Sequence, residues 1–181
     1  MGRAGPRRPI GRVTDTYVVD GDSINCRING RKQRVRLYAI DAPEAEQEGG
    51  AESTDTLGRM VYANAPLLIE IYAIDRYGRI VGLLYPERSG RDDSLNVRMV
   101  REGQAYAYTR FGGRELGVNE AQRRAQNARL GVWRRSRAGG ERPWDFRRRS
   151  RKRGMGAYRS AFWIAVILAL IIIARIAIDS W

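Results

Sequence analysis

The 181-residue chain contains no histidine and a single cysteine. The absence of histidine excludes an imidazole base, a histidine-ligated zinc site and a Ser-His-Asp triad, so carboxylates, arginines and hydroxyls must carry any chemistry. The lone Cys26 excludes an intrachain disulfide and leaves the redox compartment open. Because Cys26 alternates with Ile24 and Ile28, it is predicted to be a small buried side chain of a strand.

Acidic residues are scarce at both ends of the chain. Residues 1–12 carry four arginines and no acid, and residues 134–159 carry eleven Lys and Arg against two acids, whereas residues 13–133 carry seventeen of each sign. The two ends therefore account for the whole net charge of +13. Residues 1–12 lack the apolar stretch of a signal peptide and are expected to form a disordered basic arm. Residues 134–159 are expected to be an Arg-rich linker.

Long apolar runs are absent except near the C-terminus. Residues 161–174 are all apolar, and the apolar pattern resumes after Arg175 for residues 176–178. The whole stretch from 161 to 178 would span about 27 Å as a helix. This predicts a single transmembrane helix over residues 160–178 in contact with membrane lipid, followed by a short tail at 179–181. A docked core helix or an oligomerisation helix is the alternative. No protein partner is inferred.

The charge beside the apolar run predicts membrane orientation. Positive residues before a membrane span tend to stay cytoplasmic, so the preceding domain is predicted to lie on the cytoplasmic side. Flanking charge alone leaves the orientation open. The other interpretation of the basic ends is a clamp on nucleic acid.

Short β-rich runs between turn signals dominate the central segment. Strands are predicted over five ranges: 12–19, 23–28, 33–40, 67–74 and 80–85. Helices are predicted from Ser53 or Thr54, after a Ser94 cap to Gly103, and after an Asn119 cap to Gly131. This order indicates an α+β domain over residues 13–133, a five-stranded OB-fold β-barrel with three helices.

Four carboxylates flank two strands that the Asn-Gly turn should pair. Asp20 and Asp22 precede the first strand, and Asp41 and Glu44 follow its partner. All four are therefore expected at the same end of the hairpin, where a cation would offset their repulsion. Oxygen ligands without histidine or cysteine favour Ca²⁺ or Mg²⁺, with Asp22 and Asp41 as the best placed direct ligands and the backbone carbonyl of Ala42 as a further candidate. The alternative is a set of ordinary loop acids.

Two arginines are expected beside these acids. Arg36 lies on the strand face opposite Leu37, and Arg79 follows a tight turn at Tyr77 and Gly78. A cation with two guanidinium groups suits a phosphodiester, because they neutralise the charge that gathers on phosphorus while a carboxylate orients or deprotonates water. Taken singly, each arginine could be a salt-bridged surface residue.

Five motifs occur in order: "VVDGDSI", "RVRLYAIDAPE", "DRYGR", "LNVRMVREGQAYAY" and "EAQRRAQNARLGVW". In order and spacing they resemble the staphylococcal nuclease (thermonuclease) family over about residues 10–134. The resemblance implies an OB-fold barrel with three helices. It also implies a Ca²⁺-dependent phosphodiesterase, an endonuclease that hydrolyses DNA and RNA and leaves 3′-phosphate ends.

The resemblance assigns metal and base roles to individual residues. Asp22, Asp41 and the backbone carbonyl of Ala42 match direct Ca²⁺ ligands, and Asp20 matches an outer acidic position. Glu44 matches the residue that acts as general base or orients the attacking water. Ala42 replaces a common threonine but retains the carbonyl, so metal binding is expected to survive.

The resemblance also assigns substrate contacts. Arg36 and Arg79 match the two arginines that bind the phosphate and stabilise the transition state. Three tyrosines fall at or near substrate-contacting positions, with core packing as the alternative: Tyr77, Tyr106 and Tyr108. Residues 45–54 are acidic where the best known member has lysines, which bears on substrate affinity.

Two functions follow from the sequence. The first is a Ca²⁺-dependent nuclease tethered to a membrane by its C-terminus. The second is a catalytically silent OB-fold module that binds nucleic acid or protein from the same anchor. Because the expected carboxylates and arginines are all retained, the sequence favours the enzyme.

Overall fold

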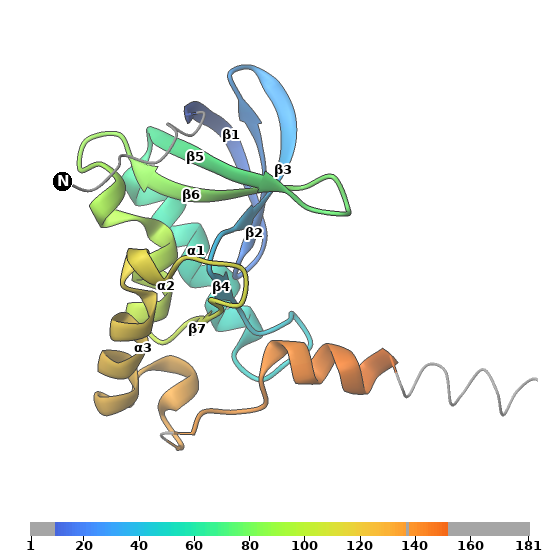
Figure 1. The fold of residues 1–181 in the computed structure, drawn as a ribbon, viewed down its shortest axis with the longest axis vertical. Coiled ribbons are helices and arrows are strands. Elements are labelled where there is room, and N and C mark those ends of the chain that lie inside the picture. The colour runs from blue at the N-terminus through green and yellow to red at the C-terminus, as the bar shows by residue number, and fades with distance from the viewer. Residues whose placement is uncertain (1–9, 137, 152–181) are drawn as a thin grey trace, which may run out of the picture. The chain divides into compact units, whose positions relative to one another are not determined.

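The computed structural model describes residues 10–136 and 138–151. Five strands form a closed barrel (Figure 1): β1 (Ile10–Asp20), β2 (Ser23–Ile28), β3 (Arg31–Leu37), β5 (Leu67–Ile74) and β6 (Ile80–Pro86). Their order around the barrel is β1-β2-β3-β6-β5, with β3 and β6 parallel and the other neighbours antiparallel. The predicted five-stranded OB-like barrel is confirmed.

The period-two pattern of the strands fills the barrel. Val35 and Leu37 of β3 are buried, as are Ile24 and Cys26 of β2, while the residues between them face outward. The predicted burial of Cys26 is therefore confirmed. Asn29 has a positive φ, as does Gly30 after it, which closes the predicted two-residue hairpin between β2 and β3.

The strand predicted over 33–40 is broken at Ala39. Ala39 has a φ of 65°, a left-handed conformation that cannot continue a β ladder. The chain turns there and begins a second short strand, β4 (Ile40–Asp41), which pairs with β7 (Tyr106–Ala107) in a separate sheet. Alternation of apolar side chains does not report φ, so the sequence pattern extended one strand through this turn.

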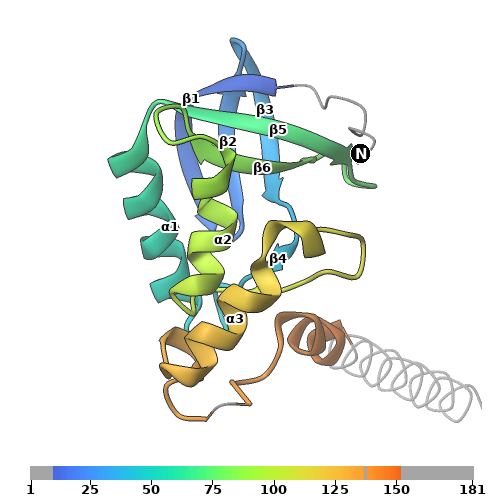
Figure 2. The ribbon, with the colours of Figure 1, turned by 60° about the vertical axis from the view of Figure 1, so that its left-hand side comes forward.

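Helix α1 (Gly50–Asn64) packs against β1 and helix α2 (Leu95–Arg101) against β6, while α3 (Val118–Asn127) packs against α2 and β7. Figure 2 shows α1 and α2 side by side, with α3 against α2. Short 3₁₀ turns occupy three further segments: Arg91–Asp93, Arg114–Leu116 and Gly131–Trp133.

The helix starts differ in how well the sequence predicted them. The Ser94 cap is confirmed, because its hydroxyl accepts the backbone N–H of Val97. The Asn119 cap is wrong. Gly117 adopts a φ of 75° and turns the chain so that α3 is already helical from Val118. The start of α1 is also earlier than predicted, at Gly50.

The compact unit that contains the barrel ends at Pro143, beyond the predicted boundary at residue 133, and a second unit begins at Trp144. Residues 143–151 are helical. Among residues 10–136 and 138–151, no helix is both long enough and apolar enough to cross a membrane. The predicted transmembrane segment, residues 160–178, lies outside the described residues, as does most of the predicted basic arm.

Candidate active site

One guanidinium joins two buried carboxylates where β2 begins and β4 ends. Arg36 Nη1 donates to Asp22 Oδ1 at 2.9 Å, and Arg36 Nη2 donates to Asp41 Oδ1. The side chains of Asp22 and Asp41 are 4% and 0% exposed, against 21% for Arg36. Register explains the meeting, since Arg36 lies opposite Ser23 in the β2–β3 ladder and therefore next to Asp22.

Both carboxylate oxygens of Asp22 accept further hydrogen bonds. Its Oδ2 accepts the backbone N–H of Ala42 at 3.0 Å, and its Oδ1 accepts the hydroxyl of Ser23 at 2.9 Å. The backbone N–H of Asp22 donates to Asp20 Oδ1 at 3.0 Å. These bonds tie the β1–β2 turn to the end of β4, so that Asp22 and the backbone of Ala42 have a fixed relative position.

Burial disfavours a charged Asp22. Desolvation is the main cause that raises the pKa of this carboxyl above its ordinary value, and the nearby charge of Asp20 acts in the same direction. Arg36 and the hydrogen bonds from Ala42 and Ser23 lower the pKa but do not cancel the effect of burial. The site therefore favours added positive charge, because two buried carboxylates share one guanidinium.

The donor set suits a hard divalent cation. Asp22 and Asp41 contribute carboxylate oxygens from one small volume, and the backbone of Ala42 lies beside them, with its N–H bonded to Asp22. Ca²⁺ accepts carboxylates, carbonyls and waters together, so two acids and a carbonyl fit it. Of the four carboxylates expected at this end of the hairpin, Asp22 and Asp41 meet at Arg36, and Asp20 accepts the backbone N–H of Asp22. In the part of the chain that the structure describes, no three His, Cys, Asp or Glu side chains gather closely enough to hold a metal.

Gly21 lets the Asp22 turn approach the rest of the site. A Cβ at Gly21 would lie 1.8 Å from Ser53 Oγ and 2.7 Å from the Cβ of Ala42. Ser53 is itself fixed, since its hydroxyl donates to the carbonyl of Gln104 at 2.7 Å. Only a glycine permits this contact between the β1–β2 turn, the start of α1 and the exit of β4.

Arg79 is positioned by the turn between β5 and β6. Arg79 Nε donates to Asp75 Oδ2 at 2.8 Å, and the backbone N–H groups of Arg79 and Tyr77 both donate to Asp75 Oδ1 at 2.9 Å. Although burial acts to raise the pKa of Asp75, these hydrogen bonds and the charge of Arg79 lower it overall. An ionised Asp75 therefore orients Arg79. Asp75 opens the "DRYGR" motif but was not among the residues predicted for the site.

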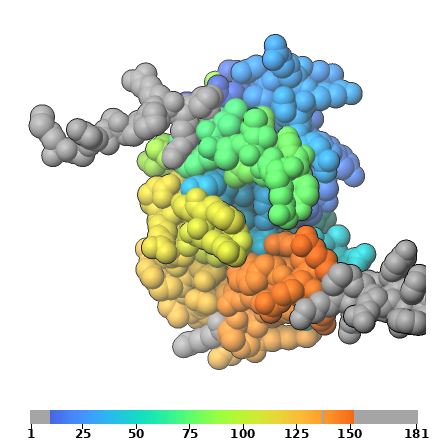
Figure 3. Space-filling view, turned by 45° about the vertical axis from the view of Figure 1, so that its right-hand side comes forward, coloured from blue at the N-terminus to red at the C-terminus, as the bar shows by residue number. Residues whose placement is uncertain are grey.

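A pocket of about 540 Å³ brings Arg36 and Arg79 together. Aromatic side chains line it beside the two arginines: Tyr38, Tyr72, Tyr108 and Phe111. The rings of Tyr38 and Tyr72 stack with their centroids 3.9 Å apart. Figure 3 shows the hollow, in which the yellow loop after β7 and the green β5–β6 segment flank recessed blue residues. The sequence could have placed Tyr38 at this site, because in the alternating pattern it falls on the same strand face as Arg36.

The three predicted tyrosines have different surroundings. Tyr108 lines the pocket, whereas Tyr77 is 61% exposed and lies with its ring centroid 5.7 Å from Cζ of Arg79. Tyr106 is only 1% exposed and packs edge-on against Trp133, at 5.0 Å between ring centroids. Its place in the core is the packing alternative considered for these tyrosines.

Glu44 is half-buried in a tight turn after Pro43. Its backbone N–H donates to Gln47 Oε1 at 3.2 Å, and Gln47 Nε2 donates to the carbonyl of Glu141. Arg142, next along the chain, places Cζ 4.9 Å from the ring centroid of Trp133. The segment that follows the 3₁₀ turn Gly131–Trp133 thus supports the Glu44 turn through the bond between Glu141 and Gln47, which are 94 positions apart.

Several known proteins are similar to this chain in sequence. The family described as staphylococcal nuclease homologue matches residues 34–135. The micrococcal nuclease of Shigella flexneri is 34% identical over 140 residues, which cover 74% of this chain and 79% of that protein. An uncharacterized endonuclease of Escherichia coli is 36% identical over 141 residues, which cover 77% of this chain and 85% of that protein. The probable staphylococcal-like nuclease CAN1 of Oryza sativa subsp. japonica is 38% identical over 122 residues, which cover 67% of this chain and 34% of that protein. The chain therefore belongs to the staphylococcal nuclease family.

Proposed function

We propose that this chain is a Ca²⁺-dependent nuclease that hydrolyses phosphodiester bonds of DNA and RNA and leaves 3′-phosphate ends. Membership of the family supports nuclease function, as do relatives named micrococcal nuclease and endonuclease. One observation carries the proposal in this chain. Arg36 contacts two buried carboxylates, Asp22 and Asp41, at a pocket that also contains Arg79.

Asp22, Asp41 and the backbone carbonyl of Ala42 would hold the Ca²⁺, with Asp20 outside them. When bound, the cation supplies positive charge that offsets the negative charge of the phosphodiester. Asp20 contributes by holding the backbone N–H of Asp22, and thereby the orientation of the neighbouring carboxylate. The raised pKa of Asp22 supports this assignment, because a carboxylate destabilised by burial gains from a cation.

The chain's own residues perform the hydrolysis around the phosphate. Arg36 and Arg79 donate hydrogen bonds to its non-bridging oxygens and stabilise the charge that develops on them. Glu44 orients the attacking water and accepts its proton as the oxygen bonds to phosphorus. The bond from phosphorus to the 5′ oxygen breaks, the leaving oxygen takes a proton from solvent, and the phosphate stays on the 3′ side.

The aromatic pocket binds the nucleotide next to the reacting phosphate. Tyr38, Tyr72 and Tyr108 offer ring faces and hydroxyls beside Arg36, which suits a flat base and its sugar. Stacking on ring faces tolerates every base, which agrees with a nuclease that accepts DNA and RNA. Tyr77, exposed at the β5–β6 turn, lies close enough to Arg79 to contact the nucleotide at the mouth of the site.

We also propose that residues 160–178 tether the enzyme to a membrane. The support is their apolar sequence and the arginines that precede it. Those arginines favour a cytoplasmic nuclease domain. Carbonate washing of membranes from expressing cells should leave the full-length chain in the membrane fraction and release a chain ending at residue 159. If protease added to intact cells digests the nuclease domain, that domain lies outside the cytoplasm and the proposed orientation is wrong.

A hydrolysis assay tests the catalytic proposal. The full-length chain is incubated with single-stranded DNA or RNA, first with Ca²⁺ and then with EDTA. We expect degradation that requires Ca²⁺. The products should carry a free 5′-hydroxyl, which a polynucleotide kinase can label, and a 3′-phosphate. Binding of the oligonucleotide without any degradation, unchanged by EDTA, would instead establish the catalytically silent binding module.

A further inference from the structure

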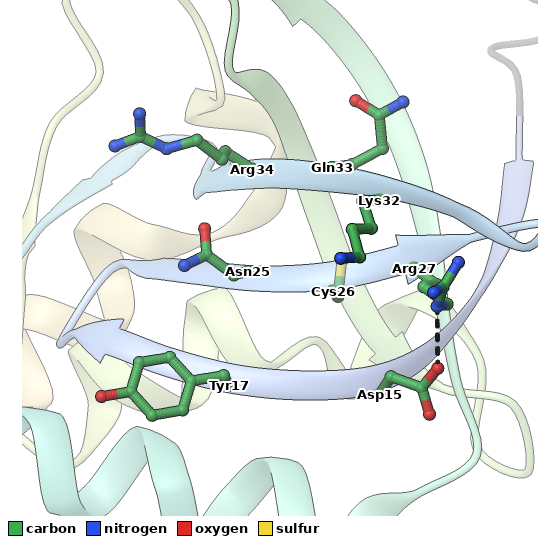
Figure 4. A pocket seen from close by; sticks show the side chains of 8 residues that line it. All are labelled: Asp15, Tyr17, Asn25, Cys26, Arg27, Lys32, Gln33 and Arg34. Carbon is green, nitrogen blue, oxygen red and sulfur yellow. Dashed lines mark ion pairs between the residues drawn. The ribbon is translucent and has the colours of Figure 1, made fainter.

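A second open pocket lies on the outer face of β1, β2 and β3, away from the aromatic pocket. Its volume is about 410 Å³, and it spans three adjacent strands. Figure 4 shows its side chains, with Tyr17 and Asp15 from β1, Asn25 and Arg27 from β2, and Lys32 from β3. None of these residues has a role in the hydrolysis proposed above.

Strand geometry connects this pocket to the active site. On β3, Val35 and Leu37 point into the barrel, so Arg36, Arg34 and Lys32 share the outer face. Alternate residues of a strand are about 7 Å apart, which is comparable to the spacing of successive phosphates in an extended single strand. Three cationic residues at alternate positions of β3 therefore lead from the candidate phosphate-binding arginine toward the β2–β3 turn.

The charges of the outer pocket do not cancel. Arg27 forms an ion pair with Asp15, at 3.1 Å between Nε and Oδ2, and also donates to the carbonyl of Gly30. Lys32 and Arg34 are exposed, and among the described residues neither forms an ion pair. Two uncompensated cations thus remain on the path that begins at Arg36.

An aromatic ring lies beside this path. Tyr17 is 70% exposed, and the strand register places it opposite Asn25, which is in turn opposite Arg34. An exposed tyrosine ring next to a row of cations is the combination with which proteins hold single-stranded nucleic acid, because the cations follow the backbone while the ring stacks on a base.

We propose that the outer face of β1–β3 is a binding track for single-stranded nucleic acid, in which Lys32 and Arg34 contact successive phosphates and Tyr17 stacks on a base. The track rests on the proposed function, because it is the extension of a substrate strand whose reacting phosphate lies at Arg36. It makes the enzyme favour long single strands over short fragments. The line of cations fits a strand better than a lipid surface, which needs no such spacing.

The test measures oligonucleotide binding by the full-length chain in EDTA, where hydrolysis is stopped. A fluorescent 20-nucleotide oligothymidine is titrated across a series of KCl concentrations. The double variant Lys32→Gln/Arg34→Gln should reduce the slope of log affinity against log salt by about 1.4, since each lost single-strand phosphate contact removes about 0.7. At 0.1 M KCl its affinity should fall by roughly tenfold.

The matched control removes two other cations. Arg101→Gln/Arg129→Gln changes the net charge equally, at exposed positions on α2 and just after α3. It should leave the salt slope within error of wild type. Equal slopes for the two double variants would overturn the track. Loss of binding to phosphatidylserine vesicles with unchanged oligonucleotide binding would also overturn it, in favour of a lipid surface.

Tyr17 and the length dependence provide independent readouts. Tyr17→Ala should weaken oligonucleotide binding at least fivefold, while Tyr17→Phe keeps the ring and should bind like wild type. In Ca²⁺, the ratio of kcat/KM on the 20-mer to that on a dinucleotide should fall about tenfold in Lys32→Gln/Arg34→Gln. An unchanged ratio overturns the track. Absence of hydrolysis by the wild-type chain refutes the proposed function instead, and the binding assay in EDTA still decides the track.

Discussion

The carboxylate of Asp22 accepts the backbone N–H of Ala42 at 3.0 Å, so the turn before β2 and the end of β4 meet at the atoms proposed to hold Ca²⁺. This bond holds the Asp22 carboxylate against the backbone of Ala42, the residue whose carbonyl is proposed as a further Ca²⁺ ligand. Arg36 then joins Asp22 to Asp41 on the same side. Metal binding and phosphate binding should therefore depend on the same few residues.

Asp41→Asn should weaken Ca²⁺ binding and hydrolysis together. The substitution removes one of two buried charges that attract the cation, and ligand charge sets Ca²⁺ affinity. We expect at least a tenfold loss of affinity, which lowers the stabilisation by excess Ca²⁺ by about 1.4 kcal/mol. Thermal denaturation with and without Ca²⁺ measures this. Asp55→Asn, on the exposed face of α1, should retain the full Ca²⁺-induced shift.

Glu44→Gln should separate turnover from metal binding. Glutamine fits the same turn but cannot accept the proton of the attacking water, so kcat should fall by about 100-fold or more. The Ca²⁺-induced shift in melting temperature should stay near that of wild type. Glu46→Gln, exposed two residues further on, is the control and should keep wild-type kcat. A kcat for Glu44→Gln equal to that of the control contradicts the assigned role.

Gly21→Ala should destabilise the fold through a steric clash. Its Cβ would lie 1.8 Å from Ser53 Oγ, so the turn must move, and overpacking of this kind costs about 1–3 kcal/mol. Gly58 offers the opposite case, because a Cβ there meets nothing within 4 Å inside α1. Gly58→Ala should stabilise by about 0.5–1 kcal/mol. Urea denaturation of both variants checks the contrast, which equal effects would contradict.

Cys26 should make stability depend on pH in the alkaline range. Burial raises the pKa of its thiol from 9.0 to about 11. Between these values the folded chain keeps a proton that the unfolded chain releases, so stability present below pH 9 is lost as pH rises through 11. The free-energy difference between wild type and Cys26→Ala should therefore shrink over this window. A difference that is constant from pH 7 to pH 11 would refute the expected titration.

Much of this organisation could be predicted because it is local. β-rich runs between turn signals located β2 and β5, the Asn29-Gly30 pair located the hairpin, and Ser94 located the start of α2. The hairpin in turn predicted that Asp22 and Asp41 would lie together. These features depend on residues close in sequence or on one short turn.

The remaining features depend on conformations and distant contacts that side-chain patterns do not report. The positive φ of Ala39 divides a continuous β-rich run. Gln47 bonds the Glu44 turn directly, and Gln47 is itself held by the carbonyl of Glu141, far along the chain. Phe111 joins the pocket because β7 pairs with β4, a register that neither segment specifies alone.

The rate of DNA hydrolysis by the full-length chain under Ca²⁺ titration, compared between wild type and Arg36→Lys, tests the central claim most directly. Wild-type rate should rise to saturation with Ca²⁺, disappear with EDTA and return when Ca²⁺ is restored. Lysine keeps the charge but not the planar fork that contacts Asp22 and Asp41, so kcat should fall at least about 100-fold. Hydrolysis independent of Ca²⁺, or a wild-type rate for Arg36→Lys, would contradict the account.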